Sequence, residues 1–465
     1  MKGRGGKWRT ALFALIYLAV IIIAFIAEED FRGAYAWRQY KHQMEAQGER
    51  FDVARLMPPK VPDNQNFGAL SIFTEPDKIH IHLPRVSFTT PRDGWRGGRA
   101  ADLMDWVSEF QQANPASAPH KVLNPARAAS VVLENLKIYD PIFAELRSAS
   151  NRPYGQFIEY QDLDENGIKR MVKLMDLGQL LDLHADAEMV AGRSDRAIED
   201  VRIMFRIDDV LKDEPTVISQ LERMGFLQCA FEPVAEGLAE HRWTEGQRAE
   251  LEASLQRIDL LESTHRAFYG ERDICGNQRY DERKGYRCEM GLYPRGWERL
   301  DQVNINRLFQ QNVFPRIDWK ERIIDPSASR AMDLELTNMA KASILRRIFL
   351  HTLFAQLTVL SCTSLPRDVA LVQSEVDMTM LACAIERYHL ATGHCPENLN
   401  ELVPKFVSAV PHDIIDGQPL RYRRTGDARF ILYSIGWNQK DDGGVAATDK
   451  DHLNGDWVWQ YPAGH

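Results

Sequence analysis

The feature that most constrains this chain is an uncharged apolar stretch near its N-terminus, from Ala11 to Ala27. As an α-helix, these 17 residues rise about 26 Å, close to the thickness of bilayer hydrocarbon. Trp8 precedes the stretch at a position from which an indole reaches the headgroup layer. The sequence therefore predicts one transmembrane helix over residues 11–27, after a short tail over residues 1–10.

Charges on the two sides of this stretch predict its orientation. Basic residues precede it and acidic residues follow it: Lys2, Arg4, Lys7 and Arg9, then Glu28, Glu29 and Asp30. Because positive flanks stay in the cytoplasm, we expect an inner-membrane protein with a cytoplasmic N-terminus and a periplasmic bulk. A cleaved signal peptide is the alternative, but cleavage after Ala27 would place Phe25 where a small residue is required.

The chain as a whole has the composition of a globular protein, with 44% hydrophobic and 26% charged residues. Its net charge of −9 disfavours a nucleic-acid partner, which requires a basic surface. Local patterns predict an α+β fold that is mostly α-helical. The expected segments are a stalk and irregular segment over 28–98, with a separate helix from Phe31 to Gly48, a helical domain over 99–345, and a long helix plus a small head over 346–465.

The stretch from Met171 to Thr264 carries the clearest helical periodicity. One apolar face leads to a glycine-containing turn over residues 191–197 and then to a second face: Leu177, Leu180, Leu181, Leu183 and His184, then Ile198, Val201, Met204 and Phe205. This pattern resembles a tetratricopeptide helix-turn-helix unit. Thr244 and Gln247 form a capping box for a helix over 248–261. A peptide-binding groove and a plain helical core are the two interpretations of these helices.

The C-terminal hundred residues predict a long helix followed by a hairpin. The amphipathic stretch runs from Val369 to His389. Gly393 is expected to terminate the helix, and Pro396 prevents its continuation. A short helix over 398–404 follows. Two alternating stretches over 419–424 and 429–434, joined by a turn, then predict antiparallel strands. We expect this small sheet to pack on the long helix, whose apolar side chains require a partner surface.

The same region resembles the soluble head of the type II secretion major pseudopilins. The resemblance covers about 100 residues and rests on an ordered series of motifs: Ala384-Ile-Glu-Arg-Tyr388, Thr392-Gly-His-Cys-Pro396, Leu402-Val-Pro404, Asp416-Gly-Gln-Pro419 with Tyr422, Tyr433-Ser-Ile-Gly436 and Asp441-Asp-Gly-Gly444. It implies an envelope protein linked to secretion machinery.

A wider resemblance spans most of the exported part. Its motifs are Phe31-Arg-Gly-Ala-Tyr-Ala-Trp37, Met57-Pro-Pro-Lys-Val-Pro-Asp-Asn-Gln-Asn-Phe67, Lys212-Asp-Glu-Pro-Thr-Val-Ile-Ser-Gln220 and Pro294-Arg-Gly-Trp297. These are similar to uncharacterised membrane-anchored proteins of planctomycete–verrucomicrobial bacteria. The similarity implies an anchor, a helical middle and a pseudopilin-like end.

One metal site is predicted, in the acidic tail after Ser434. Calcium takes six to eight oxygen ligands from flexible acidic loops, and pseudopilin heads bind it at this place. The resemblance therefore implies a calcium loop with the ligands Asn438, Asp441, Asp442 and Asp456. A solvated acidic tail without calcium is the alternative interpretation.

Other candidate sites are weaker. His80 and His82 share one face of a short strand but have no third ligand in view, and the acidic loop over 161–167 lacks the acidic twelfth residue of an EF-hand. Cys275 and Cys288 are the best disulfide pair among six cysteines. The apolar stretch from Ile348 to Leu365 is expected to be a buried helix, with a second span as the alternative.

No catalytic residue or cofactor-binding motif is identified. The chain has no G-x-S-x-G, H-E-x-x-H, P-loop or dinucleotide fingerprint. The sequence therefore favours a scaffolding or binding role at the inner membrane, with other envelope or secretion-system proteins as partners. A periplasmic hydrolase with an unrecognised active site is the alternative.

Overall fold

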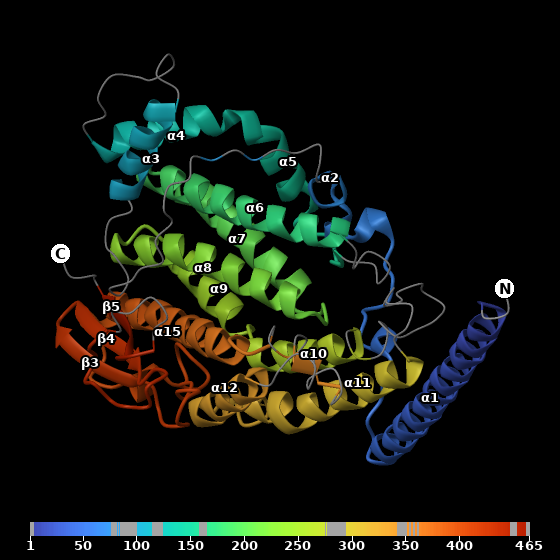
Figure 1. Ribbon diagram of the computed structural model, residues 1–465. Coiled ribbons are helices and arrows are strands. Elements are labelled where there is room, and N and C mark those ends of the chain that lie inside the picture. The colour runs from blue at the N-terminus through green and yellow to red at the C-terminus, as the bar shows by residue number, and fades with distance from the viewer. Residues whose placement is uncertain are drawn as a thin grey trace. The chain divides into compact units, whose positions relative to one another are not determined.

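The computed structural model describes residues 4–75, 100–113, 124–157, 165–274, 294–341, 362–446 and 453–461, with single positions 81, 83, 276, 351, 352, 355, 356 and 359 (Figure 1). The chain divides into two compact units. The first, here called the anchor unit, comprises Met1–Arg55, Phe268–Pro315 and Ala328–Thr363. The second, the main unit, comprises Leu56–Ala267, Arg316–Ser327 and Ser364–His465. Each unit combines segments that are distant in sequence.

The anchor unit contains α1 (Arg4–Ala46) and α11 (Arg295–Leu308), which pack against each other. Helix α1 is long and apolar enough to cross a membrane, and its most apolar window is entirely unburied. The segment predicted as a helix from Phe31 to Gly48 is helical to Ala46, but it is not a separate helix, because α1 continues through this region without interruption. No Gly or Pro stands between Ala27 and Phe31 to break it.

Beyond the end of α1 the chain is held by Arg272, whose side chain is fully buried. Its guanidinium carbon lies 4.9 Å from the ring centroids of both Phe51 and Tyr269. The same group donates a 2.7 Å hydrogen bond to Glu49 Oε2. Burial raises the pKa of Glu49, but the hydrogen bonds from Arg272, Gln310 and Tyr269 and the charge of Arg272 together outweigh burial and leave the pKa below its ordinary value. These contacts fasten the segment after α1 to the anchor unit.

The main unit is a stack of helices with a small sheet at one end (Figure 1). Its principal helices are α3 (Ala100–Ala113), α4 (Pro125–Leu136), α5 (Asp140–Ala149), α6 (Glu165–Val190), α7 (Ser194–Leu211), α8 (Val217–Ala239), α9 (Glu245–Leu255) and α15 (Leu365–Thr392). Two further helices, α10 (Leu260–Asp273) and α12 (Pro326–Ala340), contribute residues to both units. Helix α8 packs on α6, α7 and α15, and α15 also packs on α9.

Local signals set most helix boundaries. Gly192 adopts a φ of +77° in the turn between α6 and α7, and Gly393 adopts +87° at the end of α15. The capping box of Thr244 and Gln247 opens α9 as predicted. However, α9 ends at Leu255 instead of 261, because Asp259 accepts the N–H groups of Leu261 and Glu262 and starts α10.

The sheet consists of β3 (Arg421–Gly426), β4 (Arg429–Ser434) and β5 (Trp457–Tyr461), all antiparallel in the order β3-β4-β5. Leu432 pairs with Tyr422 on one side and Trp459 on the other. Leu432 and Trp459 are buried, and α15 contacts β4 and β5. The predicted hairpin and its packing on the long helix are confirmed. Strand β5 is an addition to the predicted hairpin, because the sequence predicts no strand in the acidic tail.

Several sequence predictions fall outside the described residues: His80 and His82, the Cys275–Cys288 pair, and most of residues 348–365. Of the acidic loop over 161–167, residues 165–167 begin α6 instead of forming a turn. The predicted short helix over 398–404 is a 3₁₀ helix over Leu399–Leu402, capped by Asn398. The cysteines within the described part form no disulfide with one another: Cys229, Cys362, Cys383 and Cys395.

Candidate functional site

Helices α6, α8 and α15 lie side by side and form one continuous face of the main unit (Figure 1). Small residues bring α6 and α8 close together. A Cβ atom on Gly225 would lie 2.6 Å from the side chain of Met175, and one on Gly178 would lie 3.4 Å from Cys229 Sγ. Glycine at position 225 leaves room for the end of the Met175 side chain, and Gly178 lies at ordinary contact distance from Cys229.

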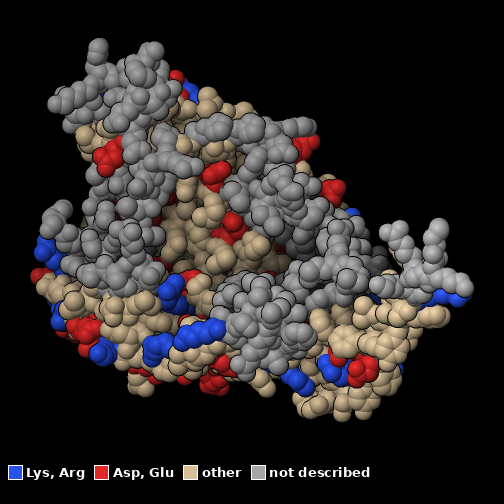
Figure 2. All heavy atoms as spheres, viewed as in Figure 1, with Lys and Arg blue, Asp and Glu red and all other residues tan. Residues whose placement is uncertain are grey.

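Four carboxylates on this face form the candidate site, here called the acidic face: Asp176 on α6, Glu222 and Glu232 on α8, and Glu375 on α15. All four are half-buried. Figure 2 shows a hollow over this part of the main unit, with acidic side chains in a wall that is otherwise mostly uncharged. The face therefore concentrates negative charge on a partly desolvated surface.

Glu222 is held in an unfavourable environment for a charge. Burial and, to a smaller extent, the nearby Asp176 carboxylate together raise the pKa of Glu222 to about 7. Its Oε2 atom is buried and has no hydrogen-bond partner among the described residues. A cation placed beside Glu222 would therefore gain more here than at an exposed carboxylate.

Glu375 shows the same property on α15. Burial raises the pKa of Glu375 to about 8; a hydrogen bond from Gln228 opposes this shift, and Glu232 adds to it. The Oε2 atom of Glu375 is also buried without a hydrogen-bond partner among the described residues. Among the described residues, no Lys or Arg contributes to the pKa of either Glu222 or Glu375.

The acidic face is extended in shape. Gln228, which bonds Glu375, lies six residues after Glu222 on α8, a separation of roughly 9 Å along the helix. Ile218 lies one turn before Glu222 and is 41% exposed, and the neighbouring Leu221 is 44% exposed. The site thus combines separated carboxylates with exposed apolar side chains, as a groove for a peptide does.

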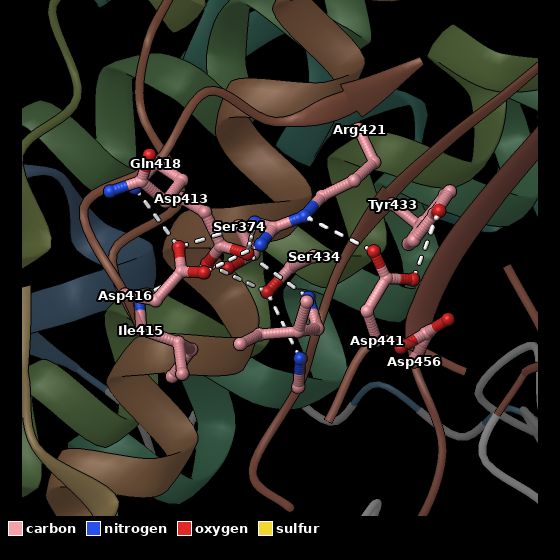
Figure 3. Close-up of polar contacts among 12 residues, drawn as sticks. Ser374, Asp413, Ile415, Asp416, Gln418, Arg421, Tyr433, Ser434, Asp441 and Asp456 are labelled. Atoms are coloured by element: carbon pink, nitrogen blue, oxygen red, sulfur yellow. Dashed lines mark hydrogen bonds and ion pairs between the residues drawn. The ribbon is translucent and has the colours of Figure 1, made fainter. Parts of the chain in front are cut away.

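A second carboxylate cluster lies at the sheet and has a different character (Figure 3). Arg421 on β3 extends between Asp413 and Asp416 on one side and Asp441 on the other. Its Nη1 is 2.8 Å from Asp413 Oδ2, its Nη2 is 2.5 Å from Asp416 Oδ2, and its Nε is 3.9 Å from Asp441 Oδ2. We call this set the Arg421 cluster.

The buried member of the Arg421 cluster, Asp413, is fully hydrogen-bonded. It accepts bonds from Ser434 Oγ at 2.9 Å, and from the backbone N–H groups of Ile415 and Ile435, each at 3.0 Å. Burial raises the pKa of Asp413, and these bonds oppose the shift. For Asp416, burial acts in the same direction, but the bonds and charge of Arg421 and the backbone N–H bonds together outweigh burial and lower the pKa. The cluster supplies its own cation and donors.

The predicted calcium ligands come together beside this cluster. Both carboxylate oxygens of Asp456 accept backbone N–H groups, from Asp442 at 3.2 Å and from Gly444 at 2.6 Å. Asn438 donates to Asp442 Oδ2 at 2.9 Å, and Asp441 accepts the Tyr433 hydroxyl at 3.1 Å. The loop is thus held by its own hydrogen bonds. Within the described residues, no group of three or more His, Cys, Asp or Glu is arranged to hold a metal.

A third polar group is sealed in the core between α5, α6 and α7. His184 Nδ1 lies 2.6 Å from Asp200 Oδ2, and Arg147 lies 3.1 Å from the other oxygen of Asp200. The ring of Phe143 covers the imidazole, with 4.2 Å between the centroids. His184 is buried on the apolar face on which the sequence placed it. This arrangement joins the three helices through their side chains.

Comparison with known proteins adds no assignment: no family model, curated protein or solved structure matches this chain. The resemblance to pseudopilin heads therefore stays a prediction. Sequence reasoning found the tail carboxylates because they lie near one another in the chain, and it missed Glu222 and Glu375. Their only signal is a lone acidic residue at a core-like position, as Glu375 is beside the buried Val376.

Proposed function

We propose that this protein is a single-pass inner-membrane protein with a binding or scaffolding role, and that its acidic face receives a basic segment of another envelope protein. The observation that carries this proposal is the state of Glu222 and Glu375. Both carboxyls are desolvated, and neither forms an ion pair with a cation in the described part of the chain. A partner that supplies the cations would remove this cost.

The chemistry of the face defines the class of partner. Desolvated carboxylates favour Lys or Arg side chains, since close charge pairs at an interface strengthen binding and guide association. The exposed Ile218 and Leu221 favour apolar side chains on the same segment. A basic amphipathic helix presents both groups at helical spacing. With the N-terminus in the cytoplasm, the face lies in the periplasm, where secretion-system components are the expected partners.

An acid–base enzyme is the second candidate function, favoured by the same two residues. Carboxyls whose pKa lies near neutrality suit general acid or base catalysis. Their spacing argues against it, because each raised carboxyl faces its own neighbour, Asp176 for Glu222 and Glu232 for Glu375. The geometry therefore supports two charge-binding positions along a groove better than one catalytic pair.

The proposal is tested with the full chain in a non-ionic detergent and a defined probe, an amphipathic helical peptide of Lys and Leu. The double variant Glu222→Gln, Glu375→Gln should weaken peptide binding about tenfold, or roughly 1.4 kcal/mol. The matched control, Glu134→Gln with Glu262→Gln, removes two exposed charges elsewhere in the main unit and should leave the affinity within about twofold. Equal losses in both variants would contradict the proposal.

A further inference from the structure

The contact between α1 and α11 fixes the position of α11 along α1, and hence the height of the anchor unit above a membrane that α1 crosses. At the N-terminal end of α11, Trp297 Nε1 donates to Glu29 Oε2 at 2.8 Å, and Gly296 N donates to Asp30 Oδ1 at 2.7 Å. Further toward the C-terminus of both helices, the Arg307 guanidinium lies 5.8 Å from the ring centroid of Tyr40. The two helices therefore run in the same direction, and their relative level is set at two points.

Two glycines lock this register. A Cβ atom on Gly33 would lie 2.0 Å from the Gly296 carbonyl oxygen, and one on Gly296 would lie 1.8 Å from the Glu29 carbonyl oxygen. Glu29 is buried by the contact and also pairs with Arg32 at 2.9 Å. Sliding α11 along α1 would bring side chains into this crossing, so α11 has one position relative to the membrane-spanning stretch.

That position brings the first turn of α11 to the end of the span. The Trp297 ring lies edge-to-face against Phe25, with 6.3 Å between the centroids. Phe25 belongs to the apolar stretch that ends at Ala27. The interfacial layer on each side of the hydrocarbon is only about 5–7 Å thick. Trp297 is bonded to Glu29 and packed on Phe25, so it falls within this layer, which tryptophan prefers.

The uncovered side of α1 carries side chains suited to the same layer. Phe31 is 69% exposed and Tyr35 is 58% exposed, and their rings stack at 6.5 Å. Phe31 lies four residues, or about 6 Å, beyond Ala27. Arg32 and Arg295 are exposed at this level, together with the acidic Glu28. Exposed aromatic rings beside arginines match the glycerol and phosphate region of a bilayer.

We propose that the anchor unit rests on the bilayer itself, with Trp297, Phe31 and Arg295 in the phospholipid headgroup layer. The chain then contacts the membrane through two segments far apart in sequence, the spanning part of α1 and the first turn of α11. This inference rests on the proposed function only in requiring that α1 spans the membrane. The occupant of the surface is the headgroup layer of the same bilayer, because α1 passes through it.

The test uses the full chain with 5-fluorotryptophan in nanodiscs of zwitterionic and anionic phospholipid. A gadolinium chelate attached to lipid headgroups broadens the fluorine signals of indoles near that layer. Trp8→Phe and Trp297→Phe assign the two resonances. The Trp297 signal should be lost together with that of Trp8, while those of the core residues Trp243 and Trp459 remain.

A Gly33→Leu variant should restore the Trp297 signal and leave Trp8 broadened, because it separates α11 from α1. Gly246→Leu is the control, since a side chain added there meets open space. A sharp Trp297 beside a broadened Trp8 in the unmodified chain would overturn the inference and leave the anchor in place. Sharp signals from both would overturn the anchor as well.

Discussion

The two carboxylate clusters of the main unit contain the same kind of residue in opposite states. In the Arg421 cluster, Asp413 is buried but accepts a guanidinium, a hydroxyl and two backbone N–H groups. On the acidic face, Glu375 is partly buried beside another carboxylate, with Gln228 as its hydrogen-bond partner. The first arrangement stabilises the fold, and the second costs stability until a ligand supplies positive charge.

The largest expected effect comes from removing the internal cation. Arg421→Ala leaves the Asp413 carboxylate buried without its charge partner, which we expect to destabilise the main unit by about 3–5 kcal/mol. Urea unfolding followed by tryptophan fluorescence measures the change. Arg424→Ala on the same strand is the matched control, because its partners Glu397 and Asp427 are exposed; its cost should be about 0–1 kcal/mol. Similar costs for both would remove the contrast between the clusters.

The opposite sign is expected on the acidic face. The pKa of Glu375 is about 8 in the folded state and near 4.5 when unfolded, so the folded state binds more protons between these values. Its contribution to stability is therefore fully present below about pH 4.5 and is lost as the pH rises through about 8. Glu375→Gln removes the charge and should stabilise the chain by about 1–3 kcal/mol at pH 9, with little effect at pH 4.5.

Unfolding curves at the two pH values measure this difference. Glu262→Gln, an exposed acid on α10, serves as the control and should change stability equally little at both. Loss of stability in Glu375→Gln at pH 9 would show that its carboxylate is internally compensated, as in the Arg421 cluster.

Calcium gives the smallest expected effect, because the tail loop already satisfies much of its own hydrogen bonding. With a dissociation constant of roughly 0.1–1 mM, calcium at about 1 mM would stabilise the chain by about 0.4–1.4 kcal/mol. A rise in melting temperature that disappears in Asp441→Asn, Asp442→Asn supports the predicted loop. Magnesium at the same concentration controls for ionic strength. An unchanged melting temperature, or the same rise in the variant, would contradict the calcium loop and favour the alternative interpretation, an acidic tail held by its own hydrogen bonds.

The parts of the fold that depend on local signals could be predicted from the sequence. The apolar stretch to Ala27, the turn at Gly192, the capping box at Thr244 and the hairpin around Leu432 each carry their signal within a few residues. Strand β5 was missed although buried Trp457 and Trp459 alternate with Val458. Its pairing partner lies in β4. The acidic segment between β4 and β5 makes the whole tail look like a polar loop, so the short alternation of apolar residues in β5 does not stand out.

The candidate sites divide in the same way. Asn438, Asp441, Asp442 and Asp456 are near one another in the chain, and the structure brings them into one hydrogen-bonded loop. Glu222 and Glu375 are 153 positions apart, and only the packing of α8 on α15 places them on one face. Their desolvation depends on that packing, which no local pattern records.

The most direct test of the account measures protons during peptide binding. At pH 7.5, a basic peptide should favour the ionised forms of Glu222 and Glu375 and displace their protons. Calorimetric titration of the full chain in buffers of different ionisation enthalpy counts the protons released. We predict net release in the unmodified chain and in Glu134→Gln, Glu262→Gln, and none in Glu222→Gln, Glu375→Gln. Peptide binding without proton release, or with the same release in all three proteins, would contradict the assignment of the acidic face as a binding site.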